Sequence, residues 1–189
     1  MGSSAQALRI ETPMLAPGTW VLDKAHTTVG FVARHMMVTK VRGRFDDFDG
    51  AIHVADAVED SWAEATIKTD SITTNSADRD GHLRSNDFLQ IDEYPEISFR
   101  STKLERSGED WKATGDLTIK GQTHPVVLDV TFEGTNVNPW GKEVAFFSAS
   151  TEIDREKWGI TWNQALESGG VLVSKKIRLE IEAQAIKAE

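Results

Sequence analysis

The densest group of reactive side chains in the sequence is Arg79-Asp80-Gly81-His82, which places a cation, a carboxylate and an imidazole within four residues. If this segment is helical, Arg79 and His82 share a face, because residues three apart are neighbours on a helix. Such a group is typical of acid–base chemistry, of contact with the polar head of a ligand, or of a capped helix in which an arginine pairs with a carboxylate. We favour the capped helix over catalysis and keep Arg79, Asp80 and His82 as head-group candidates.

Other reactive residues are scattered along the chain. The remaining histidines are His26, His35, His53 and His124, and no His-x-His or His-Glu-x-x-His spacing brings two of them together. The sequence contains no cysteine, which excludes disulfides, thiolate zinc sites and cysteine nucleophiles. It also contains no Gly-x-Ser-x-Gly elbow and no complete phosphate-binding loop. We therefore expect no catalytic residue, no metal site and no enzymatic cofactor.

The charge of the chain limits its partners. With 30 acidic and 21 basic residues the formal net charge is -9, so the long-range field repels nucleic acid. Lys40, Arg42 and Arg44 alternate at period two, which is typical of the solvated face of a strand and leaves an anion contact as the alternative. We expect no nucleic-acid partner.

The sequence also bears on location. No stretch approaches the ~20 consecutive apolar residues that a membrane span needs. Arg9 and Glu11 interrupt the short apolar stretch near the start, so the pattern of a secretory signal is not formed. These features predict a cytoplasmic protein without a membrane span.

Apolar and polar residues alternate along most of the chain, which predicts many β-strands. The clearest case is the segment 176–183, where Ile177, Leu179 and Ile181 alternate with charged residues. Similar patterns run through residues 20–23, 29–35, 41–54, 62–72, 97–99, 111–120, 126–132 and 144–153. About eight antiparallel strands joined by short turns close into a barrel or stack as a sandwich.

Short helices interrupt the strands. A helix is expected within 75–90, capped by Asn75 or Ser76, and further helical pieces are expected at 154–158 and near 164–167. Residues 1–17 are expected to form a loose tail, and residues 18–187 to form one β-domain, because 20.9 kDa fits one domain.

A series of short motifs extends this reading to a family. In order along residues 18–183 they include Trp20-Val21-Leu22-Asp23, His26-Thr27-Thr28-Val29-Gly30-Phe31, Tyr94-Pro95-Glu96-Ile97-Ser98-Phe99, Gly115-Asp116-Leu117-Thr118-Ile119-Lys120-Gly121 and Arg155 to Gly159-Ile160. Each motif is weak alone, but their joint order and spacing resemble the YceI-like polyisoprenoid-binding proteins. His124 departs from the pattern, since the family often has lysine before this proline.

The resemblance implies a fold and a function. It implies an all-β protein, a single extended, lipocalin-like antiparallel β-barrel of about eight strands with short helices. The barrel interior would hold and carry a long lipophilic ligand, such as a polyisoprenoid, a quinone tail or a polyprenyl phosphate, with no cofactor besides that bound lipid. It further implies a homodimer, and it includes periplasmic or secreted relatives.

Alternation along the strands then selects the residues that face the ligand. If the face of residues 29–35 that carries Phe31 points inward, the matching faces of the other strands line the same interior. The predicted ligand-binding residues are Phe31, Ala33, His35, Phe45, Ile67, Ile97, Phe99, Leu117, Ile119, Leu128, Val130, Phe147, Ile177 and Leu179.

Two other functions remain open at the level of sequence. One is an enzyme that acts on a lipophilic substrate in the same interior, with His35, Asp80 or His82 as acid or base. A histidine and a carboxylate meeting inside the barrel would favour it. The other is a partner-binding module with a filled barrel, which large interior side chains throughout would favour.

Overall fold

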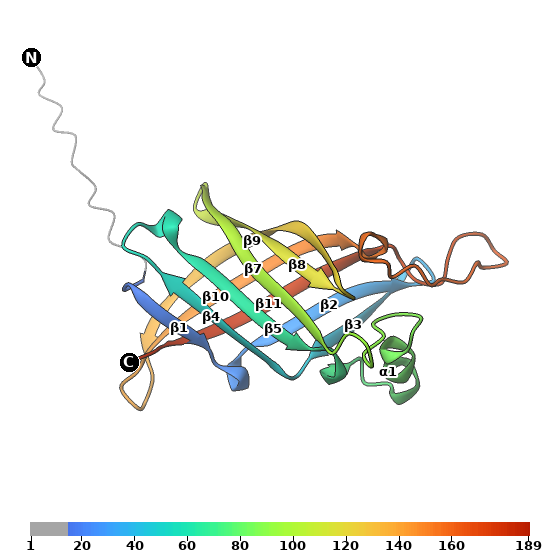
Figure 1. Ribbon diagram of the computed structural model, residues 1–189, viewed down its shortest axis with the longest axis horizontal. Helices are drawn as coiled ribbons and strands as arrows, with labels where there is room; N and C mark the ends of the chain where they lie inside the picture. The colour runs from blue at the N-terminus through green and yellow to red at the C-terminus, as the bar shows by residue number, and fades with distance from the viewer. Residues whose placement is uncertain (1–14) are drawn as a thin grey trace, which may run out of the picture.

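Eight antiparallel strands close into an elongated barrel in the computed structural model, which describes residues 15–189 (Figure 1). Neighbouring strands around the barrel follow the order β1, β4, β5, β7, β8, β9, β10 and β11, and β11 pairs with β1 to close the ring. These strands are β1 (Gly18–Leu22), β4 (Phe48–Val54), β5 (Trp62–Lys68), β7 (Glu96–Ser107), β8 (Asp110–Ile119), β9 (Gln122–Val137), β10 (Glu143–Asp154) and β11 (Lys176–Lys187). The expected antiparallel barrel is confirmed.

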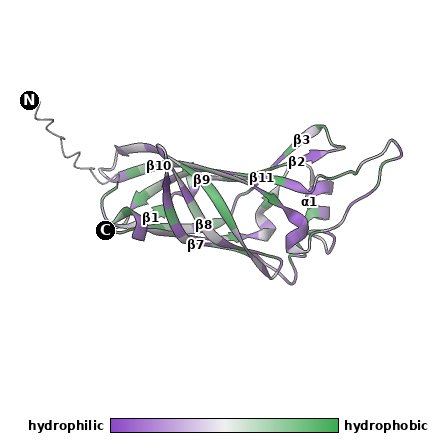
Figure 2. Ribbon diagram, turned by 90° about the horizontal axis from the view of Figure 1, so that it is seen from above, coloured by the Kyte–Doolittle hydropathy of each residue, from purple (hydrophilic) through white to green (hydrophobic). Residues whose placement is uncertain are grey.

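Three further strands extend the wall at one end. The long strand β11 pairs with β1 near its C-terminal end and with β2 (Thr28–His35) along residues 178–182. β2 forms a hairpin with β3 (Thr39–Phe45), and the short β6 (Ile72–Thr73) pairs with the end of β3. The hairpin therefore continues the barrel wall beyond the closed ring (Figures 1 and 2).

The helix α1 (Ala77–Arg84) lies at the same end of the barrel as the β2–β3 hairpin (Figure 1). Ser76 caps it, since its side chain accepts a hydrogen bond from the backbone N–H of Arg79 at 3.4 Å. The helix thus falls within the predicted range and uses one of the two predicted caps. The expected helical piece at 154–158 is a 3-10 helix, Arg155–Trp158, and three more 3-10 turns span Lys24–His26, Val58–Asp60 and Thr69–Ser71.

The prediction of a helical piece near 164–167 is wrong. Ala165 instead forms a β-bridge with Val171, and the backbone N–H of Leu166 donates to the carbonyl oxygen of Gly170 at 3.1 Å. Gly169 and Gly170 have φ angles of 89° and 86°. The two glycines supply the positive φ angles of a tight turn, so the segment folds back on itself and cannot continue as a helix.

The predicted loose tail, residues 1–17, lies mostly outside the described residues. Of its last three residues, Leu15 is buried, and the indole N–H of Trp20 donates to the carbonyl oxygen of Ala16 at 3.0 Å. Leu15 and Trp20 pack with Ala145 and Ala185 into a small core where β1 meets β10 and β11. A larger core lies toward α1, built around Phe88, Trp158 and their neighbours on β7 and β8.

Candidate functional site

The barrel encloses an elongated cavity of about 420 Å³. Its lining runs from Leu15 and Leu22 at the β1 end to Phe88 and Val173 at the α1 end. A volume of this size lies within the usual range of ligand pockets. The interior is therefore long and narrow, and it is not completely filled by side chains.

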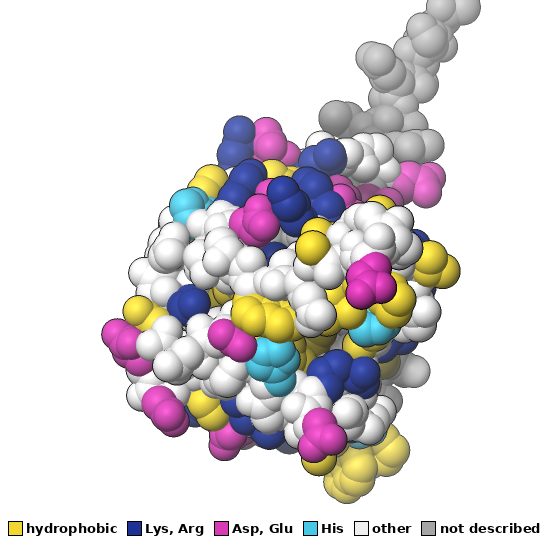
Figure 3. Space-filling view, turned by 90° about the vertical axis from the view of Figure 1, so that its right-hand side faces the viewer, with side chains coloured by type: hydrophobic (Ala, Val, Ile, Leu, Met, Phe, Trp, Pro, Cys, Tyr) yellow, Lys and Arg dark blue, Asp and Glu magenta, His cyan; other side chains and the backbone are white. Residues whose placement is uncertain are grey.

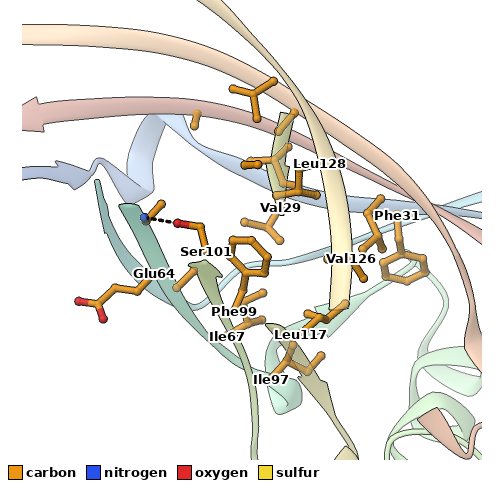
Figure 4. Close-up of a pocket in the computed structure, with 18 of the residues that line it drawn as sticks. Val29, Phe31, Glu64, Ile67, Ile97, Phe99, Ser101, Leu117, Val126 and Leu128 are labelled. Carbon is orange, nitrogen blue, oxygen red and sulfur yellow. Dashed lines mark hydrogen bonds between the residues drawn. The ribbon is translucent and has the colours of Figure 1, made fainter. Parts of the chain in front are cut away.

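Alternation along the strands makes this cavity apolar. Successive side chains of a strand point to opposite faces of the sheet, so one apolar set from each strand shares the interior. Figure 4 shows Ile97 and Phe99 of β7, Leu117 of β8 and Leu128 of β9 converging on the same space. The carboxylate of Glu64, by contrast, points away from these side chains (Figure 4).

Glycines opposite two phenylalanines make room for their rings. Phe31 of β2 is paired with Gly43 of β3, and a Cβ at Gly43 would lie 2.2 Å from Cζ of Phe31. A Cβ at Gly115 of β8 would lie 2.5 Å from the ring of Phe99. Each ring thus occupies the place of a missing side chain on the neighbouring strand. The rings lie against the wall, which leaves the centre of the barrel open.

The surface is hollowed at the α1 end. Seen from that side, apolar side chains are visible inside the hollow, and basic residues and histidines lie on its rim (Figure 3). Leu83 of α1 and Phe88 just beyond it belong to the cavity lining, and Trp162 packs against Phe88 with ring centroids 5.4 Å apart. We take this hollow as the mouth of the cavity.

The side chain of Arg155 is charged and belongs to the cavity wall. The guanidinium of Arg155 is buried, and it donates to the carbonyl oxygens of Ile160 at 2.8 Å, Ser174 at 2.9 Å and Val173 at 3.4 Å. Burial lowers the pKa of Arg155, although the neighbouring carboxylates of Glu156 and Asp154 act in the opposite direction. Its hydrogen bonds fasten the 160–174 segment to the end of β10, so Arg155 shapes the mouth.

A second polar group lies in the wall, and unlike Arg155 it has no hydrogen-bond partner among the described residues. Trp111 of β8 is 5% exposed and lines the cavity, and among the described residues nothing accepts a hydrogen bond from its Nε1. Ser101 differs, since its Oγ accepts from the backbone N–H of Ala63 at 2.8 Å (Figure 4). The wall therefore offers few polar contacts, and apolar burial dominates its chemistry.

Comparisons with known proteins place this barrel in a family. A model described as the YceI-like domain matches residues 20–185. The chain belongs to the YceI-like family. A UPF0312 protein of Staphylococcus aureus is 42% identical over 168 residues, which make up 87% of this chain and 95% of that relative.

Solved structures agree with this assignment. The Campylobacter jejuni YceI protein is 34% identical and superposes with a TM-score of 0.71, covering 89% of this chain and 97% of its own. A polyisoprenoid binding domain from Saccharophagus degradans has a TM-score of 0.68 over 89% of this chain and 98% of that chain. At 14% identity, the second likeness shows a shared fold.

The predicted ligand-binding residues can now be located in the YceI-like barrel. All of them except His35 line the cavity. His35 lies at the end of β2, where the hairpin has passed the mouth, and its side chain is exposed. Placing His35 in the interior was therefore wrong: its strand face was chosen correctly, but the cavity ends near Ala33.

The three head-group candidates do not form one site. Arg79 is exposed, and its Nε and Nη2 donate to Oγ1 and the carbonyl oxygen of Thr74 at 2.7 and 2.8 Å. Asp80 is buried and accepts hydrogen bonds from the backbone N–H and Oγ1 of Thr74. Burial raises the pKa of Asp80, but these hydrogen bonds and the Arg84 charge outweigh it, so the pKa is lowered. Both residues hold α1 in place.

His82 lies closer to the mouth. Its Nε2 is 2.8 Å from Oδ2 of Asp87, and its ring meets the rings of Phe88 and Trp162 edge-on at 5.0 and 4.6 Å. His82 therefore packs on a residue of the lining without belonging to the lining itself. Within residues 15–189, no histidine lines the cavity.

Several lining residues were not selected from the sequence. Trp111 shares the face of Leu117 at period two, so extending the alternation to the start of β8 would have found it. Phe88, Val173 and Arg155 come from segments without alternation and had no such signal. Across the described residues, no group of three or more histidine, aspartate and glutamate side chains could hold a metal ion, and no helix is long and apolar enough to span a membrane.

Proposed function

We propose that this YceI-like protein binds and carries one long lipophilic chain of the isoprenoid type inside its barrel, without catalysing a reaction on it. The observation that carries the proposal is the apolar cavity that follows the barrel from Leu22 to Phe88. The name of the Saccharophagus degradans relative, a polyisoprenoid binding domain, points to the same class of ligand.

Burial of a chain supplies enough free energy without polar chemistry. Each buried methylene contributes about 0.8 kcal/mol, so a chain of about fifteen carbons contributes about 12 kcal/mol. Association costs on the order of 4–15 kcal/mol in lost freedom. Three or more isoprene units are therefore needed for useful affinity, which favours long chains over small apolar molecules.

Two observations favour this proposal over its alternatives. A filled barrel would need the rings of Phe31 and Phe99 in the centre, whereas they lie over Gly43 and Gly115. A histidine and a carboxylate inside the barrel would favour an enzyme, whereas the His82–Asp87 pair lies outside the lining. The positions of the two rings and of the His82–Asp87 pair both support a binding function.

Mass spectrometry of lipid retained by the protein tests the proposal. The protein is purified without detergent, its organic extract is analysed, and the stripped protein is then offered polyprenol in solution. We expect a long-chain lipophilic compound in the extract and uptake of at most one polyprenol per chain. Folded protein that carries no lipid and takes up no polyprenol would show that the cavity serves another purpose.

Assembly and location remain predictions. We propose a homodimer and a cytoplasmic location; light scattering of the purified protein and fractionation of the cells that produce it test the two proposals separately.

A further inference from the structure

Three consecutive apolar residues are exposed at the tip of the β2–β3 hairpin. Met36, Met37 and Val38 are 50%, 60% and 75% exposed. Single exposed apolar residues are ordinary, but a run of three at a protruding tip is unfavourable in water and is typical of a surface that contacts a partner. The tip is therefore a candidate contact surface.

The backbone of the tip is strained as well. Met36 and Met37 have φ angles of 50° and 66°, and the backbone N–H of Val38 donates to the carbonyl oxygen of His35 at 3.2 Å. This pattern of two positive φ angles is that of a type I′ turn, which strongly favours asparagine and glycine. Turn chemistry does not explain two methionines here. Met37 packs in part on the 160–174 segment, because a Cβ at Gly170 would lie 2.2 Å from its Sδ, yet Met37 is still 60% exposed.

The tip lies just beyond the mouth of the cavity. Phe31 and Ala33 of β2 line the cavity, and the same strand reaches the tip only a few residues later. The backbone N–H of Met36 donates to the carbonyl oxygen of Leu172 at 2.8 Å, next to Val173 of the lining. The hairpin and the 160–174 segment project together from the α1 end (Figures 1 and 2).

The hairpin behind the tip is basic. Residues 28–45 include Arg34, Lys40, Arg42 and Arg44 and no carboxylate. Arg34 and Lys40 face each other directly across the two strands, an arrangement that is unfavourable for two like charges. Arg42 and Arg44 are in ion pairs with Glu180 at 3.3 Å and Asp46 at 2.8 Å. The hairpin is thus locally cationic although the chain is acidic.

We propose that the β2–β3 tip inserts into the surface of a lipid bilayer that contains anionic lipids and holds the cavity mouth against it. Methionine side chains suit this role because they are apolar and adapt their shape. Arg34 and Lys40 then lie at the level of the anionic head groups, each such cation favouring contact. The net charge of the whole chain matters less, because salt screens charges beyond about 8 Å.

A second copy of the chain fits the tip less well. Two tips that met would bring two Arg34–Lys40 pairs together, and like charges at a contact suppress association. A bilayer with anionic lipids offers an apolar interior and opposite charge at once. Exchange of ligand between the bilayer and the cavity through this contact would rest on the proposed function, whereas bilayer binding itself does not.

Vesicle flotation tests the contact without any ligand. Wild-type protein is mixed with vesicles of phosphatidylcholine, alone or with phosphatidylglycerol, and protein that floats with the vesicles is measured. We expect binding to the mixed vesicles that weakens as salt is raised. Met36→Asn with Met37→Gly should lower this binding at least about tenfold, since each methionine loses most of its apolar contact.

The double variant is expected to fold, because asparagine and glycine suit the turn better than methionine. A loss of vesicle binding would then not be due to misfolding. Trp140→Ser is the matched surface control. Trp140 is 81% exposed in the loop between β9 and β10, near β1 and the C-terminal end of β11, at the other end of the barrel. It should bind vesicles like wild type.

Three outcomes would overturn the proposal. Wild type that floats with neither vesicle has no bilayer contact, and a double variant that floats as well as wild type does not use the tip. Light scattering that shows a dimer lost in the double variant assigns the tip to a second copy. Polyprenol uptake from solution, measured on the same samples, tells failure of the bilayer contact apart from failure of the ligand-binding function.

Discussion

Leu128→Trp is expected to close the cavity from within. Leu128 lies on β9 opposite Ala113 of β8, and both residues line the cavity, so a larger side chain can extend over the alanine. Tryptophan adds about six non-hydrogen atoms to leucine and displaces about as many carbons of a bound chain. At about 0.8 kcal/mol per carbon, affinity should fall by about 5 kcal/mol, or more than a thousandfold.

The assay is a titration of stripped protein with a fluorescent polyprenyl probe, with near-ultraviolet circular dichroism to show that each variant is folded. Val127→Trp is the matched control: it adds the same atoms one residue earlier, at a side chain that is 44% exposed and absent from the lining. It should bind like wild type. If folded Leu128→Trp bound the probe as tightly as Val127→Trp, the ligand would not occupy the interior.

Three further predictions concern the hairpin, the lumen and α1. Met36→Asn with Met37→Gly should raise the free energy of unfolding by about 1 kcal/mol, measured in urea, because asparagine and glycine adopt positive φ angles at lower cost than methionine. An unchanged urea midpoint would contradict backbone strain at the two methionines. Gly43→Ala should push the Phe31 ring into the lumen and cost about 1–3 kcal/mol in probe affinity or stability; wild-type values for both would contradict this. Asp80→Asn should lower the free energy of unfolding by about 1–3 kcal/mol at neutral pH. Because the pKa of folded Asp80 is lowered, its contribution is present above the unfolded pKa and lost as pH falls through the folded value, so wild type and variant should converge in acid.

Alternation predicted the long strands well because one face of each is buried against the same interior. On β8 and β11, the apolar sets that contain Leu117 and Leu179 line the cavity as expected. His35 shows the limit of this reasoning, since a strand keeps its alternation after it leaves the barrel. The end of the interior is set by where the facing segments stop, since Phe31 and Ala33 of the same strand still line the cavity.

The mouth was harder to predict, because long-range contacts decide it. Asn163 holds Val173 at the lining, since its Nδ2 donates to the carbonyl oxygen of Val173 at 2.7 Å and its Oδ1 accepts from the Val173 N–H at 3.0 Å. A β-bridge with His35 and a hydrogen bond from Arg155 at 3.4 Å add to this, and neither partner is marked by a periodic pattern near Val173. The helix proposed near 164–167 failed because a turn with two positive φ angles, at Gly169 and Gly170, redirects the chain. The glycine pair was the local signal that could have corrected it.

Interior binding can be observed directly by methyl nuclear magnetic resonance of protein loaded with polyprenol. Leu117 and Leu128 line the cavity on β8 and β9, and Val127 lies between lining residues on the opposite face. The cavity model predicts nuclear Overhauser contacts from the chain to the methyl groups of Leu117 and Leu128 and none to Val127. Contacts to Val127 without contacts to the two leucines would place the ligand on the outer surface and contradict the central claim.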